Sequence, residues 1–136
     1  MTERPRLEDL VRSWVSKAEH DLLNIENNLA ANDIPWDKVC FHAQQCGEKY
    51  LKSLLVFQGI DFPKIHDLRE LYVLLPKELP LPIDPRLLDR LNPYAIEGRY
   101  PGVWEPVERE EALRAVEAAR AVRDAIRRVL PPTCLR

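Results

Sequence analysis

The residues best suited to chemistry lie in the segment from Phe41 to Lys52. Gln45, Glu48, Lys49 and Lys52 follow one another at three- and four-residue steps, which on a helix forms a continuous polar strip beside the apolar face. Amides and charges in such a half-buried position cost free energy unless they are paired. We therefore expect partners on another helix, another subunit or a ligand, and an interhelical hydrogen-bond network is the favoured interpretation.

A second group of candidate side chains lies further along the chain. The His66 ring is predicted to hold the loop before a third helix, and contact with a ligand is the alternative. Tyr94, Arg99 and Tyr100 place a cation and two aromatic rings around a short loop, where they could stack a base and hold a phosphate. They could equally fasten the loop, with Arg99 paired to a carboxylate such as Glu48. The candidate ligand-binding set is therefore Gln45, Glu48, Lys49, Lys52, His66, Tyr94, Arg99 and Tyr100.

The usual signatures of catalysis and metal binding are missing from the sequence. The four glycines are isolated, so there is no glycine-rich phosphate loop, and neither HExxH nor GxSxG occurs. His20, His42 and His66 fall on three different predicted helices, and no two of them have metal-ligand spacing. We predict no metal site and no cofactor.

The cysteines point to reduced, structural side chains. Cys40, Cys46 and Cys134 are an odd number without CxxC spacing, which argues against a disulfide framework and against a zinc knuckle. Cys46 is predicted to be a small core residue.

Apolar residues recur at steps of three and four over five segments, which predicts helices. The expected helices cover about 7–29, 36–58, 66–75, roughly three turns from Pro85, and about 106–130. The second has so wide an apolar surface that it should be the central helix, and Gly47 within it suggests close approach of a neighbour. The fold class is all-α: an up-and-down bundle of four to five antiparallel helices.

Prolines and caps set the boundaries between these helices. The segment 76–85 holds four prolines and is expected to be a rigid, extended connection and not a domain boundary. Asp84 and Pro85 suit an N-cap followed by a first-turn proline, and Asn92-Pro93 should bend or divide the fourth helix. We expect a single domain over 1–136, with its core at about 7–130.

Composition excludes several functional classes. The chain has 136 residues, of which 46% are hydrophobic and 31% charged, as in an ordinary globular domain. Its formal charge of −2 lacks the basic excess of a protein whose whole surface grips nucleic acid, although a local basic patch is compatible with it. Without an apolar span or a signal-like N-terminus, the expected location is cytoplasmic.

Four stretches of the sequence resemble the HEPN domain family. Residues 14–22 look like its opening helix, and residues 44–52 closely match its QQxxEKxLK helix. Residues 66–71 resemble its H-x-L-x-x-L element, and residues 99–101 resemble the RYP turn that precedes the last helix in one branch. The resemblance covers about 7–130, with the motifs in the same order as in the family.

This resemblance implies a helical bundle that commonly forms a homodimer. Members are often encoded beside, or fused to, a nucleotidyltransferase-fold protein and have been proposed to bind nucleotides. Another branch comprises ribonuclease toxins of toxin–antitoxin and defence systems, whose signature is arginine, four to six residues, then histidine on the last helix. The present sequence departs from that signature because no histidine follows His66.

The missing histidine argues against a ribonuclease function. Metal-free RNA cleavage needs a general acid or base, for which histidine has a suitable pKa and arginine does not. The favoured hypothesis is a noncatalytic HEPN module that dimerises, binds a nucleotide or RNA and partners a nucleotidyltransferase-type protein, with no membrane contact. The alternatives are a metal-independent ribonuclease that uses His42 or His66, and a purely structural dimerisation unit.

Overall fold

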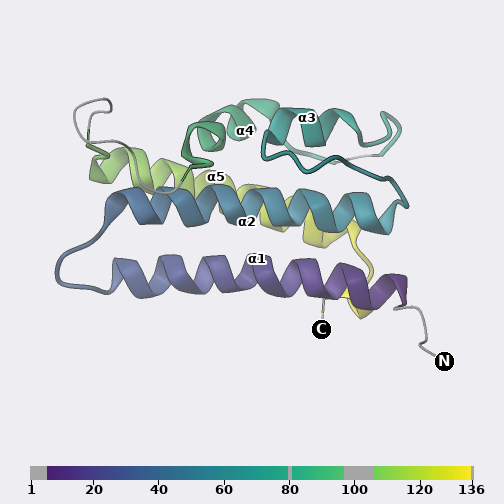
Figure 1. Cartoon of the computed structure of the whole chain (residues 1–136), viewed down its shortest axis with the longest axis horizontal. Coiled ribbons are helices and arrows are strands. Elements are labelled where there is room, and N and C mark those ends of the chain that lie inside the picture. Colours follow the sequence, from purple (N-terminus) through teal and green to yellow (C-terminus); the bar gives the residue numbers. More distant parts are fainter. Residues whose placement is uncertain (1–5, 80, 97–105, 136) are drawn as a thin grey trace.

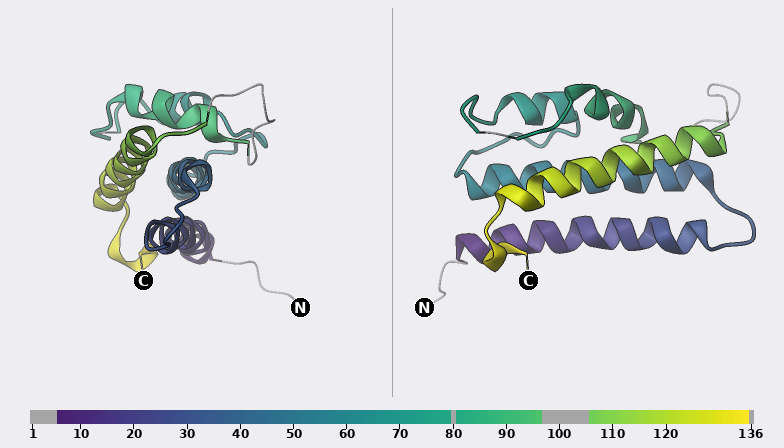
Figure 2. Two further views of the ribbon diagram at one scale, coloured as in Figure 1. Left: turned by 90° about the vertical axis from the view of Figure 1, so that its left-hand side faces the viewer. Right: turned by 180° about the vertical axis from the view of Figure 1, so that it is seen from behind.

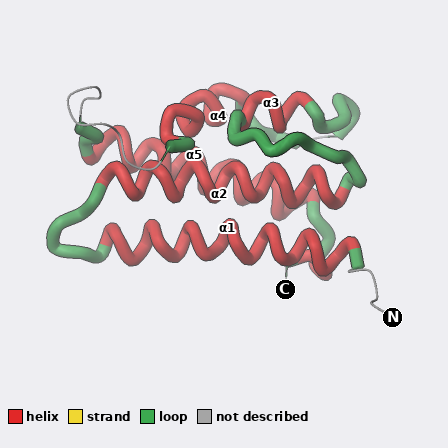
Figure 3. Tube along the Cα trace, in the orientation of Figure 1, coloured by secondary structure: helices red, strands yellow, loops and turns green. Residues whose placement is uncertain are grey.

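The computed structural model describes residues 6–79, 81–96 and 106–135, and every regular element in those ranges is helical (Figures 1 and 3). The α-helices are α1 (Leu7–Leu29), α2 (Trp36–Phe57), α3 (Leu68–Val73), α4 (Pro85–Leu91) and α5 (Arg109–Val129). Two short 3-10 helices, η1 (Asn92–Tyr94) and η2 (Pro132–Cys134), follow α4 and α5. The predicted all-α class is confirmed.

The two longest helices, α1 and α2, form an antiparallel hairpin (Figure 1). On α1 the buried apolar residues recur at steps of three and four, so that one stripe of the helix packs against α2. That stripe consists of Val11, Val15, Ala18, Leu22 and Ile25.

Helix α2 is the centre of the bundle. It packs against α1 on one side and α5 on another, while α3 and α4 lie along a third (Figure 2). Neighbours on several sides account for its wide apolar surface and confirm the predicted central position. Cys46 is fully buried there, as expected, and burial raises the pKa of its thiol to about 12.

Gly47 lets α4 approach α2 closely. A Cβ atom at this position would stand 3.0 Å from Cδ1 of Leu91 and 3.7 Å from Cδ1 of Leu68. The close neighbour inferred from the glycine is therefore α4. The cost of a glycine in mid-helix, about 1 kcal/mol relative to alanine, is offset by this packing.

Side-chain caps and prolines limit the short helices. Asp84 accepts from the Arg86 backbone N–H, with Pro85 in the first turn of α4, as the sequence predicts. Asn92-Pro93 divides this region into α4 and η1. Helix α3 is shorter than expected at both ends. It begins later because Asp67 is its N-cap and accepts from the Glu70 N–H. It ends earlier because the expected last residue, Leu75, precedes a proline, and that position is disfavoured in a helix.

Helix α5 begins at Arg109, three residues later than its sequence pattern suggests. Glu108 has extended dihedrals and serves as the N-cap, while Val107 before it is buried. The 3-10 helix η2, which was not expected from the sequence, packs on α1, where Arg12 donates to the Thr133 carbonyl over 2.9 Å. None of the described helices is both long enough and apolar enough to cross a membrane.

A polar group, the Glu19 cluster, joins the three long helices. Arg123 on α5 donates to both carboxylate oxygens of Glu19 on α1, over 2.8 and 3.0 Å. Tyr50 on α2 donates to the same carboxylate over 2.5 Å and accepts from Arg127 over 3.2 Å. Partial burial raises the pKa of Glu19, but the hydrogen bonds from Arg123 and Tyr50 outweigh it and hold the pKa below its ordinary value.

Replacement of Gly47 by valine should destabilise the fold. The new methyl groups would overlap Leu91, and overpacking of a well-packed core typically costs about 1–3 kcal/mol. Urea unfolding checks this expectation, with Ser16→Val on the exposed face of α1 as the control for the helix propensity of valine. Equal losses in the two variants would contradict the close packing at Gly47.

The Glu19 cluster should make stability depend on acid pH. A carboxyl group with a lowered folded-state pKa contributes stability above its ordinary value of 4.5, and this contribution is lost as the pH falls through the folded-state value. Urea unfolding over a pH series should therefore show wild type losing stability more steeply than Glu19→Gln below about pH 5. Glu117→Gln, at an exposed site on α5, should follow the wild-type curve. Parallel curves for wild type and Glu19→Gln would refute this role.

Candidate functional site

Glu48, near the middle of α2, is the centre of the predicted polar strip. Its side chain is only 4% exposed, yet it has three hydrogen-bonding partners. Lys52 donates to Oε2 over 3.0 Å, and Gln44 donates to Oε1 over 3.2 Å. The ring Nδ1 of His66 lies 3.0 and 3.1 Å from the two oxygens. We call Gln44, Glu48, Lys52 and His66 the Glu48 cluster.

Lys52 lies inside the protein, where two aromatic rings cover its ammonium group. The residue is 6% exposed, and its Nζ lies 5.6 Å from the centre of the Trp14 ring and 5.7 Å from that of Phe62. The two rings meet edge to face at 6.2 Å. Cation–π contact and the Glu48 carboxylate together replace the water that the ammonium loses on burial.

His66 lies at the outer edge of the cluster, just before α3. Gln44 also donates to the His66 carbonyl over 3.1 Å, so both the backbone and the ring are held against α2. Leu68, two residues further on, is held as well, because its N–H donates to the Asn92 side chain over 2.8 Å. The predicted role of the ring, holding the loop before the third helix, agrees with these contacts.

Lys49, although it belongs to the same strip, turns toward α1. Its ammonium donates to Oδ2 of Asp21 over 2.5 Å, and Nδ1 of His42 lies 2.8 Å from Oδ1 of the same carboxylate. Asp21 is 5% exposed, so it is a second buried acid with two partners from α2. We call Asp21, His42 and Lys49 the Asp21 cluster.

Of the remaining candidates, Gln45 and Tyr94 are described, and neither belongs to the Glu48 cluster or the Asp21 cluster. Gln45 donates to Gln44 over 2.7 Å and so borders the Glu48 cluster. Tyr94 is buried and its hydroxyl donates to Glu111 on α5, which favours the structural role for this residue. Arg99 and Tyr100, with the possible pairing of Arg99 to Glu48, lie outside the described residues.

Sequence reasoning found one side of these contacts and missed the other. The three- and four-residue spacing identified Glu48, Lys49 and Lys52 but not Asp21 or Trp14, their partners on α1. Both partners lie within residues 14–22, which the resemblance to the family's opening helix had singled out. The resemblance of that segment to the family was therefore the feature of the sequence that could have pointed to Asp21 and Trp14. The favoured interpretation of the strip, an interhelical hydrogen-bond network, agrees with the observed contacts.

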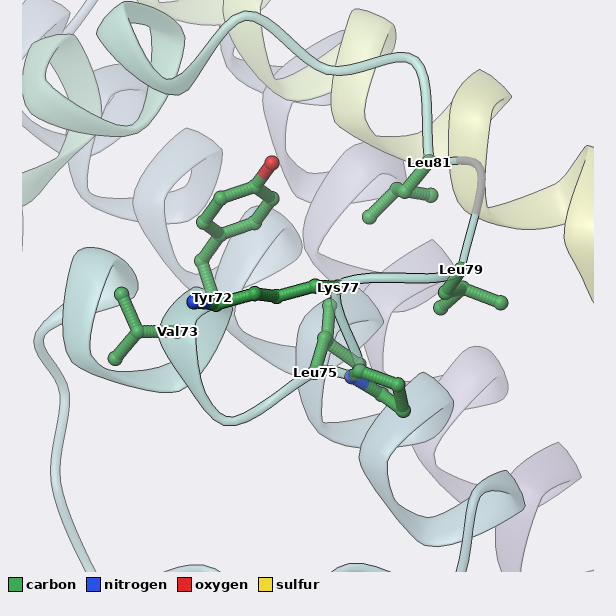
Figure 4. Close-up of a pocket in the computed structure, with 7 residues that line it drawn as sticks. Tyr72, Val73, Leu75, Lys77, Leu79 and Leu81 are labelled. Atoms are coloured by element: carbon green, nitrogen blue, oxygen red, sulfur yellow. The ribbon is translucent and has the colours of Figure 1, made fainter.

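A separate hollow of about 300 Å³ lies where α3 meets the proline-rich segment (Figure 4). It is lined by Tyr72, Val73, Leu75, Pro76, Lys77, Leu79 and Leu81. None of the predicted site residues lines it, and Lys77 is the one charged member of its lining. Among the described residues, no group of three histidine, cysteine or acidic side chains could hold a metal ion.

Comparison with known proteins finds one matching family model and one similar solved structure. The model of the HEPN domain matches residues 11–129. A solved archaeal HEPN homologue superposes with a TM-score of 0.62 at 25% sequence identity, over 88% of this chain and 96% of that one. Among curated proteins, none matches the sequence significantly.

Removal of both charges from the Glu48 cluster should cost less than the sum of the two single removals. Glu48→Gln leaves the buried Lys52 without its carboxylate, and breaking a buried pair in this way costs about 3–5 kcal/mol. The double variant Glu48→Gln/Lys52→Met should lose clearly less than the sum of the single losses in urea unfolding.

The matched control is an exposed pair, Arg69 and Asp89, whose side chains are 44% and 51% exposed. Asp89→Asn should cost at most about 1 kcal/mol. Additive losses at Glu48 and Lys52 would show that their interaction does not stabilise the fold.

Proposed function

Because the HEPN model matches residues 11–129, the chain belongs to the HEPN family, and we propose that it is a noncatalytic, dimerising module that binds a nucleotide or RNA. We further propose that a nucleotidyltransferase-fold protein is its partner, in a toxin–antitoxin or defence setting. One observation carries the binding proposal: residues of the QQxxEKxLK and H-x-L-x-x-L elements meet at Glu48, beside an exposed His66 ring.

The geometry limits which groups can meet a ligand phosphate. Lys52 is buried against Glu48, and Lys49 is paired with Asp21, so a ligand phosphate would compete with an internal carboxylate for either ammonium group. The proposal therefore assigns the phosphate contact to Arg99 and the base contact to Tyr100. His66 and Gln45 would border the ligand from the side of α2.

The noncatalytic part of the proposal rests on His66 and on the final helix. No histidine follows His66 in the sequence, so α5 carries arginines without an imidazole. The His66 side chain is 65% exposed, so the described residues do not enclose its ring. The oriented ring is nevertheless the feature that a ribonuclease alternative would use, and cleavage of RNA would identify that alternative.

The purely structural alternative expected an exposed apolar patch on α2 or on α5. Among the described residues, no large hydrophobic side chain of α2 is exposed, and on α5 only Leu113 is, at 39%. The described residues of these two helices therefore give no support to dimerisation as the sole role of the module.

A thermal-shift titration with ATP, GTP and a short RNA tests the proposal. A ligand at 100 times its dissociation constant adds about 2.7 kcal/mol to the stability, which raises the melting temperature by several degrees. Arg99→Ala should weaken the binding of the active ligand severalfold. The ligand is analysed afterwards and should be intact.

The control is Arg128→Ala, which removes the same charge from an exposed position on α5 and should bind like wild type. Lys52 is avoided as a test position because its loss would disturb the buried pair with Glu48. The proposal fails if no ligand shifts the melting temperature, or if Arg99→Ala and wild type bind equally well.

A further inference from the structure

His66 combines a fixed orientation with high exposure. Its Nδ1 lies 3.0 and 3.1 Å from the two oxygens of Glu48, and Gln44 holds its backbone carbonyl over 3.1 Å. The Glu48 side chain is 4% exposed, whereas the His66 side chain is 65% exposed. One edge of the ring is therefore bound to a buried acid while the other faces solvent.

The contact with Glu48 determines which ring nitrogen is nucleophilic. Glu48 is paired with the ammonium of Lys52, and a carboxylate can only accept hydrogen bonds. Nδ1 must then carry the hydrogen, and the lone pair of the neutral ring is on Nε2. The exposed edge is thus the nucleophilic edge.

The other two histidines lack one or other of these properties. His42 is oriented in the same way, with Nδ1 at 2.8 Å from Asp21, but its side chain is only 20% exposed. His20 is exposed on α1, and its ring forms no hydrogen bond with the described residues. His20 therefore serves as the control for ring orientation, and His42 serves as the control for exposure.

A purely structural role does not explain the arrangement fully. Lys52 and Gln44 already donate to the Glu48 carboxylate, so the buried acid has partners without the imidazole. High exposure also suits a group that is modified from outside, because a donor or a second protein can reach it without any opening of the fold.

We propose that Nε2 of His66 is a phosphoryl-acceptor site for small activated phosphates such as phosphoramidates and acyl phosphates. With an N-protonated phosphoramidate, whose nitrogen carries three hydrogens, the Nε2 lone pair forms the new N–P bond, the donor P–N bond breaks, and neutral ammonia leaves with its electron pair. With an acyl phosphate, the bond between phosphorus and the acyl oxygen breaks instead, and a carboxylate leaves with that electron pair. Positive charge develops on the ring as the bond forms, and the Glu48 carboxylate stabilises it across the Nδ1–H contact. The site does not depend on nucleotide binding.

The test treats the intact protein with potassium phosphoramidate at about pH 8.5, where an ordinary histidine is neutral. Peptide mass spectrometry follows phosphorylation at each histidine, and phosphorus NMR identifies the nitrogen. His66 should react severalfold faster than His20 and only at Nε2, and His42 should react more slowly than His66.

Two variants separate reactivity from structure. His66→Asn retains an amide donor near the position of Nδ1, so the fold should persist while the fast phase disappears. Glu48→Gln should slow His66 to the rate of His20 and allow both ring nitrogens to react. The comparison of His66 with His20 in wild type stands even if Glu48→Gln does not fold.

Equal rates at His66 and His20 in the wild-type protein, or a mixture of Nδ1 and Nε2 products at His66, would overturn the proposal. Either result would leave His66 as a structural contact alone. Nucleotide binding by the wild type would be unaffected by that result, so the two proposals can fail separately.

Discussion

The buried ion pair between Glu48 and Lys52 determines how the side chains around it are arranged. Both residues lie on α2 four positions apart, and both are almost completely shielded from water. Charges in such a place are tolerated only when every polar atom is paired. The need for partners explains why Trp14 and Phe62 cover the ammonium and why Gln44 donates to the carboxylate. Helix α1 and the segment between α2 and α3 are thus positioned around one pair of charges on α2.

Two further acids on α1 are also paired with basic side chains of neighbouring helices. Glu19 joins α1 to α5 through Arg123, and Asp21 joins α1 to α2 through Lys49. These contacts are directional, whereas apolar side chains of similar size can pack at more than one register. Apolar burial accounts for the packing of the other two long helices, α1 and α5, against α2. The acids on α1 and α2 account for the particular alignment of those helices.

Much of the fold could be predicted because its signals are local. Periodicity located α1 and α2 within a residue at each end, and Asp84-Pro85 marked the start of α4. The start of α5 was less accurate, since apolar residues such as Val107 continue the pattern into an extended segment. For the candidate site, the sequence predicted the residues of α2 but not their partners on α1. Helical spacing shows that Lys49 and Lys52 share a strip, but their partners come from α1, and the spacing within one helix carries no information on a contact 28 residues away such as Lys49 with Asp21.

The paired state of the lysines changes the expected chemistry of this HEPN chain. An exposed lysine strip would attract any phosphate, whereas here the two ammonium groups are already neutralised by Glu48 and Asp21. In the proposed binding, the attraction of a phosphate therefore depends less on these two lysines and more on groups outside the pairs. The exposed edge of His66 is such a group, and it is oriented by the same carboxylate that neutralises Lys52. Structure and reactivity on this face therefore have a common origin in one buried acid.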